Sequence, residues 1–345
     1  MGRLTKEIKV GNVKVGGNSP ISIQSMTNTL TKDVDKTIDQ IHGLEEAGCE
    51  IIRVSVPDDE SLNALKKIKE NISIPLVADI HFDHRLAVGA SKYVDKLRIN
   101  PGNIGDSSKV KEVVNAAKEY SLPIRIGVNL GSLEKDIGAR FGLTPKGLVE
   151  SALKNIKLLE DNDFYNIILS LKASDVSKTI KAYQMISKLI EYPLHLGITE
   201  SGSLFSGTIK SSIGIGSLLS QGIGDTIRVS LSADPIEEIK VGKQILQGLG
   251  LRRFGVEVTA CPTCARANFD VSKIALEVED KVKDIKTPLK VAIMGCGVNG
   301  PGEAKEADIG VVGGADGCLF YKDGEIKEKI KESEIVDKVV KEIQK

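Results

Sequence analysis

Three cysteines in the last third of the chain have the spacing of a metal centre. Cys261 and Cys264 stand in "ACPTCARANF", and Cys296 stands further along in "VAIMGCGVNGPGEAKEADIG". A Cys-x-x-Cys pair can ligate one metal centre, and Pro262 stiffens the turn between the two thiols. Since thiolates are strong ligands of zinc and of iron–sulfur clusters, this pattern predicts a bound metal.

Zinc is one alternative for this centre. A structural zinc site normally has four ligands, commonly as two close pairs of Cys or His. No second pair follows here, because the histidines all lie in the N-terminal two thirds of the chain, and Cys49 and Cys318 are typical of buried packing residues. A zinc site would therefore lack a ligand.

A dinucleotide-binding loop is a second alternative. Gly295, Gly297 and Gly300 satisfy G-x-G-x-x-G after the strand-like "LKVAIM". That fingerprint requires a helix to start at the loop, whereas Pro301 follows the third glycine and the next apolar run begins at Asp308. We expect no full crossover helix there, so the match is weak.

An iron–sulfur cluster explains the pattern with fewer additional assumptions than zinc or a dinucleotide. Glycines let backbone N–H groups approach the sulfides closely. Three thiolates leave one iron of a four-iron cluster without a cysteine, and Glu303, shortly after Cys296, can occupy or guard that iron. Because an open iron is a Lewis acid, such a 4Fe–4S centre can also bind substrate.

Short apolar or β-branched runs alternate with amphipathic segments in the first two thirds of the chain. There are about eight of them, the number that a closed parallel barrel requires. They are "ISIQSM" from 21, "IIRVSV" from 51, "PLVADIH" from 75, "DKLRINPG" from 95, "IRIGVN" from 124, "NIILSLK" from 166, "LHLGITE" from 194 and "TIRVSLS" from 226. This α/β alternation predicts a TIM (β/α)8 barrel, with an open doubly wound sheet as the rival. A hairpin with a turn at Gly11 and Asn12 is expected before it.

Polar residues follow these runs, and barrel active sites form at the C-terminal ends of the strands. The end positions are Arg53, Asp79, His81, Arg98, Asn100, Arg125, Asn129, Lys172, Glu200, Arg228 and Ser230. Four arginines and a lysine with only two acids predict an anion site large enough for a diphosphate. In the alternative interpretation, the cations pair with Asp79 and Glu200 as an internal salt-bridge layer. A purely structural role for either acid stays open, and His84 and Arg85 are expected only to start a helix.

The length of 345 residues predicts two domains, a barrel at 1–245 and a small domain at 259–345, joined by a linker at 246–258. The 47 basic and 47 acidic residues cancel, which argues against a general affinity for nucleic acid or an acidic membrane. Neither a signal peptide nor a run long enough to span a membrane is evident. We therefore expect a cytoplasmic protein, in which five cysteines fit metal binding or catalysis better than a disulfide framework.

The blocks "CPTC" and "MGCGVNGPGEAKEADIG" resemble the iron–sulfur domain of the 4-hydroxy-3-methylbut-2-enyl diphosphate synthase family. The resemblance extends over essentially the whole chain, through "SMTNTLTKDVDKTIDQI", "VADIHFDHRLA", "LRINPGNIG" and "LGITESG". It is closest to the compact two-domain bacterial form. It implies a TIM barrel followed by a small α/β domain similar to part of sulfite reductase, which carries a 4Fe–4S cluster on Cys261, Cys264 and Cys296, with Glu303 as the fourth ligand.

The resemblance also implies an activity. Two electrons from flavodoxin or ferredoxin open the ring of 2-C-methyl-D-erythritol 2,4-cyclodiphosphate, release water and yield 4-hydroxy-3-methylbut-2-enyl diphosphate. Glu303, Glu200 and Asp79 are the expected catalytic residues. The diphosphate is expected to bind Arg53, His81, Arg98, Asn100, Arg125, Asn129, Lys172, Arg228 and Ser230. Family members are head-to-tail homodimers, and we expect the same assembly.

Two other classes remain as alternatives. A zinc-stabilised barrel hydrolase of a phosphorylated substrate would keep the arginines but contain no iron. A nucleic-acid-modifying protein would need a basic surface with aromatic side chains, whereas aromatic residues make up 4% of this chain and its net charge is zero.

Overall fold

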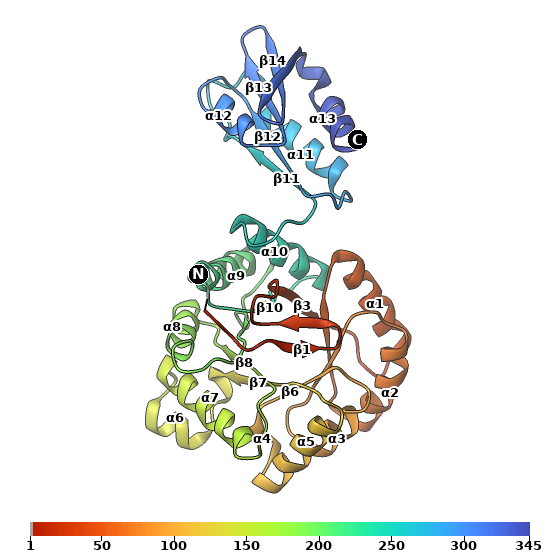
Figure 1. Cartoon of the computed structure of the whole chain (residues 1–345), viewed down its shortest axis with the longest axis vertical. Helices are drawn as coiled ribbons and strands as arrows, with labels where there is room; N and C mark the ends of the chain where they lie inside the picture. The colour runs from red at the N-terminus through yellow and green to blue at the C-terminus, as the bar shows by residue number, and fades with distance from the viewer. Residues whose placement is uncertain (1–2) are drawn as a thin grey trace. The chain divides into compact units, whose positions relative to one another are not determined.

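The computed structural model describes residues 3–345, which form two compact units that divide between Arg252 and Arg253 (Figure 1). The division falls within the range expected for a linker, 246–258. Helix α10 (Pro235–Gly248) ends inside that range and strand β11 (Val256–Ala260) begins inside it. The segment without helix or strand is therefore shorter, 249–255.

An antiparallel hairpin precedes the barrel, as the sequence predicts. Strands β1 (Ile8–Val10) and β2 (Val13–Val15) pair through a turn at Gly11, whose φ of 57° suits glycine. Their buried side chains pack against residues near the starts of the barrel strands, such as Ile51 and Ile168. The hairpin thus covers the N-terminal end of the barrel.

The predicted runs all form strands of one parallel barrel. Within residues 3–345 this sheet has eight strands in the order β8-β7-β6-β5-β4-β3-β10-β9, and a parallel bridge between Leu169 and Leu194 links the two ends of the order. The strands are β3 (Ser22–Met26), β4 (Ile51–Ser55), β5 (Leu76–Asp79), β6 (Lys96–Ile99), β7 (Ile124–Asn129), β8 (Ile167–Lys172), β9 (His195–Leu196) and β10 (Thr226–Ile227). The barrel prediction is confirmed, and the open sheet is excluded.

Helices surround these strands (Figure 1). They are α1 (Val34–Ala47), α2 (Asp59–Glu70), α3 (His84–Ala90), α4 (Pro101–Ile104), α5 (Ser107–Glu119), α6 (Lys135–Phe141), α7 (Pro145–Glu160), α8 (Val176–Ile186), α9 (Leu204–Leu219) and α10. Many begin at a capping side chain; the Asp58 carboxylate, for example, accepts a hydrogen bond from the Ser61 N–H at the start of α2. His84 starts α3, as expected. Across the described range, none of the helices is long and apolar enough to cross a membrane.

The second unit is a mixed sheet covered by helices. The strands are β11, β12 (Leu289–Met294), β13 (Ile309–Gly314), β14 (Gly317–Lys322) and β15 (Glu325–Ile330). They lie side by side in chain order, the first three parallel and the last three antiparallel. Helices α11 (Val271–Val282) and α13 (Ile335–Ile343) pack on a core that includes Val291, Phe320 and Cys318. The interpretation of Cys318 as a core residue is confirmed.

The glycine-rich loop leads into a short helix. Helix α12 (Gly300–Lys305) starts directly at the loop, although the position of Pro301 argued against a helix start there. Pro301 lies in the first turn, where its missing N–H needs no partner. At six residues, α12 is nevertheless no full crossover helix.

Candidate functional site

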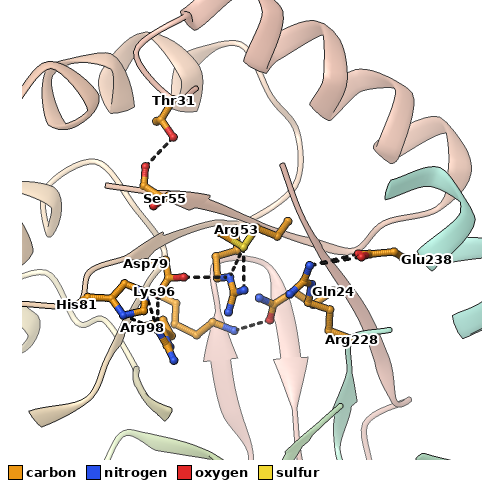
Figure 2. A network of polar contacts seen from close by, with 11 residues as sticks. Gln24, Thr31, Arg53, Ser55, Asp79, His81, Lys96, Arg98, Arg228 and Glu238 are labelled. Atoms are coloured by element: carbon orange, nitrogen blue, oxygen red, sulfur yellow. Dashed lines mark hydrogen bonds and ion pairs between the residues drawn. The ribbon is translucent and has the colours of Figure 1, made fainter. Parts of the chain in front are cut away.

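Charged residues predicted at the strand ends converge on one mouth of the barrel, and Figure 2 shows Arg53, Asp79, His81, Arg98 and Arg228 among them. Arg53, Asp79, Arg98 and Arg125 lie on neighbouring strands, and Arg98 stands directly opposite Arg125 in the sheet register. Lys172 ends β8, and Arg228 follows β10 directly. Successive interior positions of a strand are two residues apart, which is why one side chain per strand reaches this level.

Asp79 is the centre of an ion-pair network in this mouth. Its carboxylate lies 2.8 Å from Arg98 Nη1 and 3.5 Å from Arg53 Nε, and the residue is only 4% exposed. Burial by itself would raise the pKa of Asp79, but Arg53, His81 and Arg98 outweigh it and hold that pKa well below its usual value. Asp79 is therefore a carboxylate that orients cations, so part of the salt-bridge interpretation is correct.

Two further contacts fix the arginines around Asp79. Arg53 donates hydrogen bonds of 3.1 and 2.8 Å from Nε and Nη2 to the Met26 thioether, and burial lowers its pKa to about 10. His81 is half-exposed at the rim, with Nε2 3.1 Å from Arg98 Nη1. These contacts hold the guanidinium groups in place before any ligand arrives.

A second buried carboxylate, Glu238 on α10, was missed by the sequence analysis. It lies 3.4 Å from Arg228 Nη2 and is 4% exposed. Site positions were predicted only at strand ends, whereas Glu238 lies on a helix, ten residues beyond Arg228. No pattern in that helix distinguishes it from its neighbour Glu237.

Among residues 3–345, Arg125 and Lys172 form no ion pair with an acidic side chain. Arg125 is 1% exposed, and its Nε and Nη1 atoms have no hydrogen-bond partner among residues 3–345. Burial, followed by repulsion from neighbouring arginines, lowers the pKa of both Arg125 and Lys172 well below the ordinary values. Over the same range, the Nε atoms of Arg98 and Arg228 are also buried without partners. Unpartnered buried donors of this kind are suited to an anionic ligand.

Glycines on the barrel interior make room for two of these cations. A Cβ atom at Gly127 would lie 2.5 Å from Arg98 Nε, and one at Gly197 would lie 2.8 Å from Lys172 Nζ. Real Cβ atoms do not approach so closely, so any larger residue would displace the cation. The cations therefore lie directly against backbone.

A second polar layer, which was not predicted, lies deeper in the barrel, one interior position below the arginines. Lys96 and His195 are fully buried, and Lys96 Nζ lies 3.4 Å from Gln24 Oε1. Neither ring nitrogen of His195 has a hydrogen-bond partner in the described part of the chain. Lys96 stands two residues before Arg98 on the same strand, so the two-residue period of a strand could have identified it.

The remaining predicted site residues lie around this cluster and have local contacts. Asn100 and Asn129 accept hydrogen bonds from the N–H groups of Gly102 and Gly131, at 3.3 and 3.1 Å, which caps short helical turns. Ser230 accepts a hydrogen bond at its backbone carbonyl from Ser201. Glu200 is exposed, with a positive φ of 52°. Their predicted roles toward a ligand stay predictions.

Two of the predicted metal ligands follow neighbouring strands in the second unit. Cys261 comes directly after β11, and Cys296 comes two residues after β12, which pairs with β11 in parallel. The Gly295 N–H donates a 3.2 Å hydrogen bond to Cys261 Sγ, and the Asn268 N–H donates a 2.8 Å bond to the Gly295 carbonyl. The two cysteine-bearing loops are thus held together by hydrogen bonds that main-chain N–H groups donate.

The other two predicted ligands stand on the surface of the same loops. Cys264 and Glu303 are exposed, Glu303 in the first turn of α12. Across residues 3–345, no three His, Cys, Asp or Glu side chains are gathered as a metal ion would need. The donors themselves fit a thiolate-bound cluster, because the three cysteines form no disulfide and one sulfur already accepts an N–H bond.

Comparison with known proteins gives consistent matches in both units. The family model described as "GcpE TIM-barrel domain" matches residues 5–243, and that described as "GcpE protein C-terminal domain" matches 257–345. A 4-hydroxy-3-methylbut-2-en-1-yl diphosphate synthase (flavodoxin) from Caldanaerobacter subterraneus subsp. tengcongensis is 59% identical over 100% of this chain and 98% of its own length. The enzyme of the same name from Geobacillus thermodenitrificans is 55% identical over 99% of this chain and 92% of its own length.

Among solved structures, a dihydropteroate synthase from Stenotrophomonas maltophilia covers 71% of this chain and 98% of its own, with a TM-score of 0.53 and 11% identity. At this identity the likeness concerns the barrel fold alone.

Proposed function

Because the chain belongs to the 4-hydroxy-3-methylbut-2-en-1-yl diphosphate synthase (GcpE) family, we propose that its barrel mouth binds the substrate diphosphate and its cysteine loops hold the redox cofactor. The chain is an oxidoreductase of the non-mevalonate isoprenoid pathway. It reduces 2-C-methyl-D-erythritol 2,4-cyclodiphosphate to 4-hydroxy-3-methylbut-2-enyl diphosphate. Two electrons are consumed, the ring opens at a C–O bond, and one oxygen leaves as water. The zinc hydrolase alternative finds no support in the relatives.

The observation that supports the diphosphate site is the excess of buried donors in the mouth. Within residues 3–345, Arg125 and Lys172 form no ion pair with a carboxylate, and the Nε atoms of Arg98 and Arg228 are buried without hydrogen-bond partners. Charge-assisted hydrogen bonds to phosphate oxygens would satisfy them, each contributing roughly 1.5 to 3 kcal/mol. As the ring opens, a diphosphate oxygen gains negative charge, which the same cations stabilise.

The carboxylates of the mouth have a different task. Asp79 and Glu238 pair with cations that would otherwise repel one another, and so fix where their N–H groups point. Glu200, exposed on the loop after β9, is free to contact the substrate hydroxyl groups.

We further propose that Cys261, Cys264 and Cys296 hold a 4Fe–4S cluster, with Glu303 as its fourth ligand. When bound, the cluster delivers electrons singly and offers a Lewis-acidic iron. Glu303 can hold the hydroxyl group that leaves as water, or move a proton to it. Its position in the first turn of α12, with an exposed side chain, supports this role.

The partners follow from the same family membership. Relatives are named for flavodoxin, so we propose flavodoxin, or ferredoxin as another one-electron carrier, as the electron donor. Diphosphate and cofactor sites lie on separate units and must meet for reaction, which the head-to-tail homodimer of the family would achieve. A cytoplasmic location remains a prediction; the unpaired state of the cysteines at positions 49, 261, 264, 296 and 318 supports it.

Anaerobic purification followed by iron and sulfide analysis tests the cofactor and the reaction together. We expect about four irons and four sulfides per chain, with turnover of the cyclic diphosphate by dithionite and a viologen. Zinc in place of iron would overturn the cofactor proposal. A cluster without turnover would overturn the assignment of the substrate.

A further inference from the structure

Glu238 has more contacts than an ion pair needs. Its carboxylate accepts a 3.1 Å hydrogen bond from Ser25 Oγ on β3 and a 2.9 Å bond from the Leu231 N–H, and it lies 3.4 Å from Arg228 Nη2. It therefore joins three parts of the barrel, namely β3, helix α10 and the loop that follows β10. Figure 2 shows Glu238 facing Arg228 at the edge of the cation cluster.

The loop held by Glu238 carries two predicted diphosphate ligands. Arg228 and Ser230 stand on it, and Leu231, whose N–H Glu238 accepts, follows directly. This loop is in turn attached to the loop after β9, because Ser201 donates to the Ser230 carbonyl and the Ser232 N–H donates to the Gly202 carbonyl at 2.9 Å. Glu200 precedes Ser201, so three predicted site residues depend on one assembly of two loops.

The charge of Glu238 also determines which edge of Arg228 remains available. Nη2 faces the carboxylate, whereas Nε is buried and has no partner anywhere in residues 3–345. Holding one edge of a guanidinium leaves the remaining N–H groups directed along a fixed line. A buried arginine without its acid would instead be pushed away by Arg53, a neighbour close enough to interact with it electrostatically.

We propose that Glu238 is a positioning residue, which keeps Arg228 and the two connected loops in the arrangement that binds the substrate diphosphate. This inference rests on the proposed function of the barrel mouth. Glu238 does not itself touch substrate; it acts through Arg228.

Replacing Glu238 by Gln, with nearly the same shape, removes the charge. We expect the Kd of the cyclic diphosphate for the unreduced holoenzyme, measured by isothermal titration calorimetry, to rise about 10- to 30-fold. KM should rise in parallel, with kcat changed less than about 3-fold, because the groups that react are untouched. The matched control is Glu237→Gln on the same helix, whose carboxylate pairs with Lys240 at the surface, and it should bind as wild type does.

A double-mutant cycle with Arg228→Met tests whether Glu238 affects substrate binding through Arg228. Glu238→Gln should weaken binding much less in the Arg228→Met background than alone. A full additional loss there would show that Glu238 acts independently and would overturn the inference. So would a wild-type Kd for Glu238→Gln when Arg228→Met binds weakly. If Arg228→Met itself bound the cyclic diphosphate as wild type does, the result would contradict the proposed diphosphate site instead.

Thermal denaturation shows whether each variant is folded. Should Glu238→Gln not fold, Ser25→Ala removes one hydrogen bond from the carboxylate and leaves its charge. We expect a 2- to 5-fold higher Kd from this variant, consistent with the loss of about one hydrogen bond. An unchanged Kd in Ser25→Ala would then overturn the inference.

Discussion

The barrel mouth and the cysteine loops organise their functional side chains in opposite ways. In the mouth, buried carboxylates and a thioether hold the arginines, as Asp79 holds Arg98 at 2.8 Å. On the cysteine loops, Cys264 and Glu303 are exposed, and the loops are held together by main-chain hydrogen bonds such as that from the Asn268 N–H to the Gly295 carbonyl.

The difference separates two ways of preparing a site. The mouth gathers like charges before the ligand arrives, which costs folding free energy because some buried donors stay unpaired. In the loops, mainly the backbone is arranged in advance, and binding of the cofactor determines the final positions of the ligand side chains. Changes in the mouth should therefore weaken substrate binding while altering stability, whereas loss of a loop cysteine should determine whether the cofactor is present at all.

The largest effect is expected from Cys296→Ser on the cysteine loops. Loss of one thiolate ligand should remove the cluster, with less than one iron per chain and no measurable turnover, as shown by iron analysis and a reductase assay. Cys318→Ala is the control, because Cys318 is buried in the core of the same unit and should cost only about 1 kcal/mol while iron is retained. Full iron content in Cys296→Ser would contradict the assigned ligand.

Glu303→Ala should separate cofactor binding from catalysis. We expect the iron content to stay near that of wild type while kcat falls about 100-fold, the scale of a lost proton-transfer group. The exposed Glu306, at the end of the same helix, gives the control variant Glu306→Ala. Turnover like that of wild type in Glu303→Ala would remove this residue from the mechanism.

Arg125→Met and Arg98→Met test the cost of assembling the mouth. Both should weaken substrate binding about 10- to 100-fold. Their melting temperatures should move in opposite directions. Arg125→Met removes a buried cation that forms no ion pair within residues 3–345 and should raise Tm, by about 2–4 °C per kcal/mol. Arg98→Met takes a partner from Asp79 and should lower Tm. A lower Tm in Arg125→Met would show that the unpaired Arg125 cation does not destabilise the folded protein.

The smallest effect concerns acid stability. The folded-state pKa of Asp79 lies well below 3.8, so its stabilising contribution is present above that pH and is lost as the pH falls through the folded value. Asp79→Asn should therefore be less stable than wild type at pH 7, and the difference should shrink at pH 3, as followed by urea unfolding. The exposed Asp35→Asn is the control and should show no such convergence. A difference that did not depend on pH would contradict the ion-pair account.

Much of the barrel could be predicted from the sequence. Runs such as "IRIGVN" and "NIILSLK" have the length and β-branched content of buried strands, and their ends locate Asn129 and Lys172, whereas Arg125 is the second residue of its strand. The loop helix α12 was missed because Pro301 was interpreted as a break, although the first turn of a helix accepts proline.

The partners of the predicted residues could not be predicted in this way. Glu238 and Ser25 meet at 3.1 Å although 213 positions separate them, and no local pattern encodes such a contact. The same holds for Met26, whose thioether accepts from Arg53 only because β3 and β4 are adjacent in the barrel. Strand ends follow from local periodicity, whereas the side chains that hold them follow from closure of the sheet.

That closure has a consequence for how a ribosome produces the chain. β3 pairs with β10, and Thr226 bonds to Ser22 across 204 positions, so the barrel cannot shut until most of the chain has emerged. Until then, β3 is an unpaired edge on the nascent polypeptide. In the second unit, by contrast, each strand pairs with the next one synthesised. Chains that terminate before residue 226 should therefore require chaperones and aggregate without them.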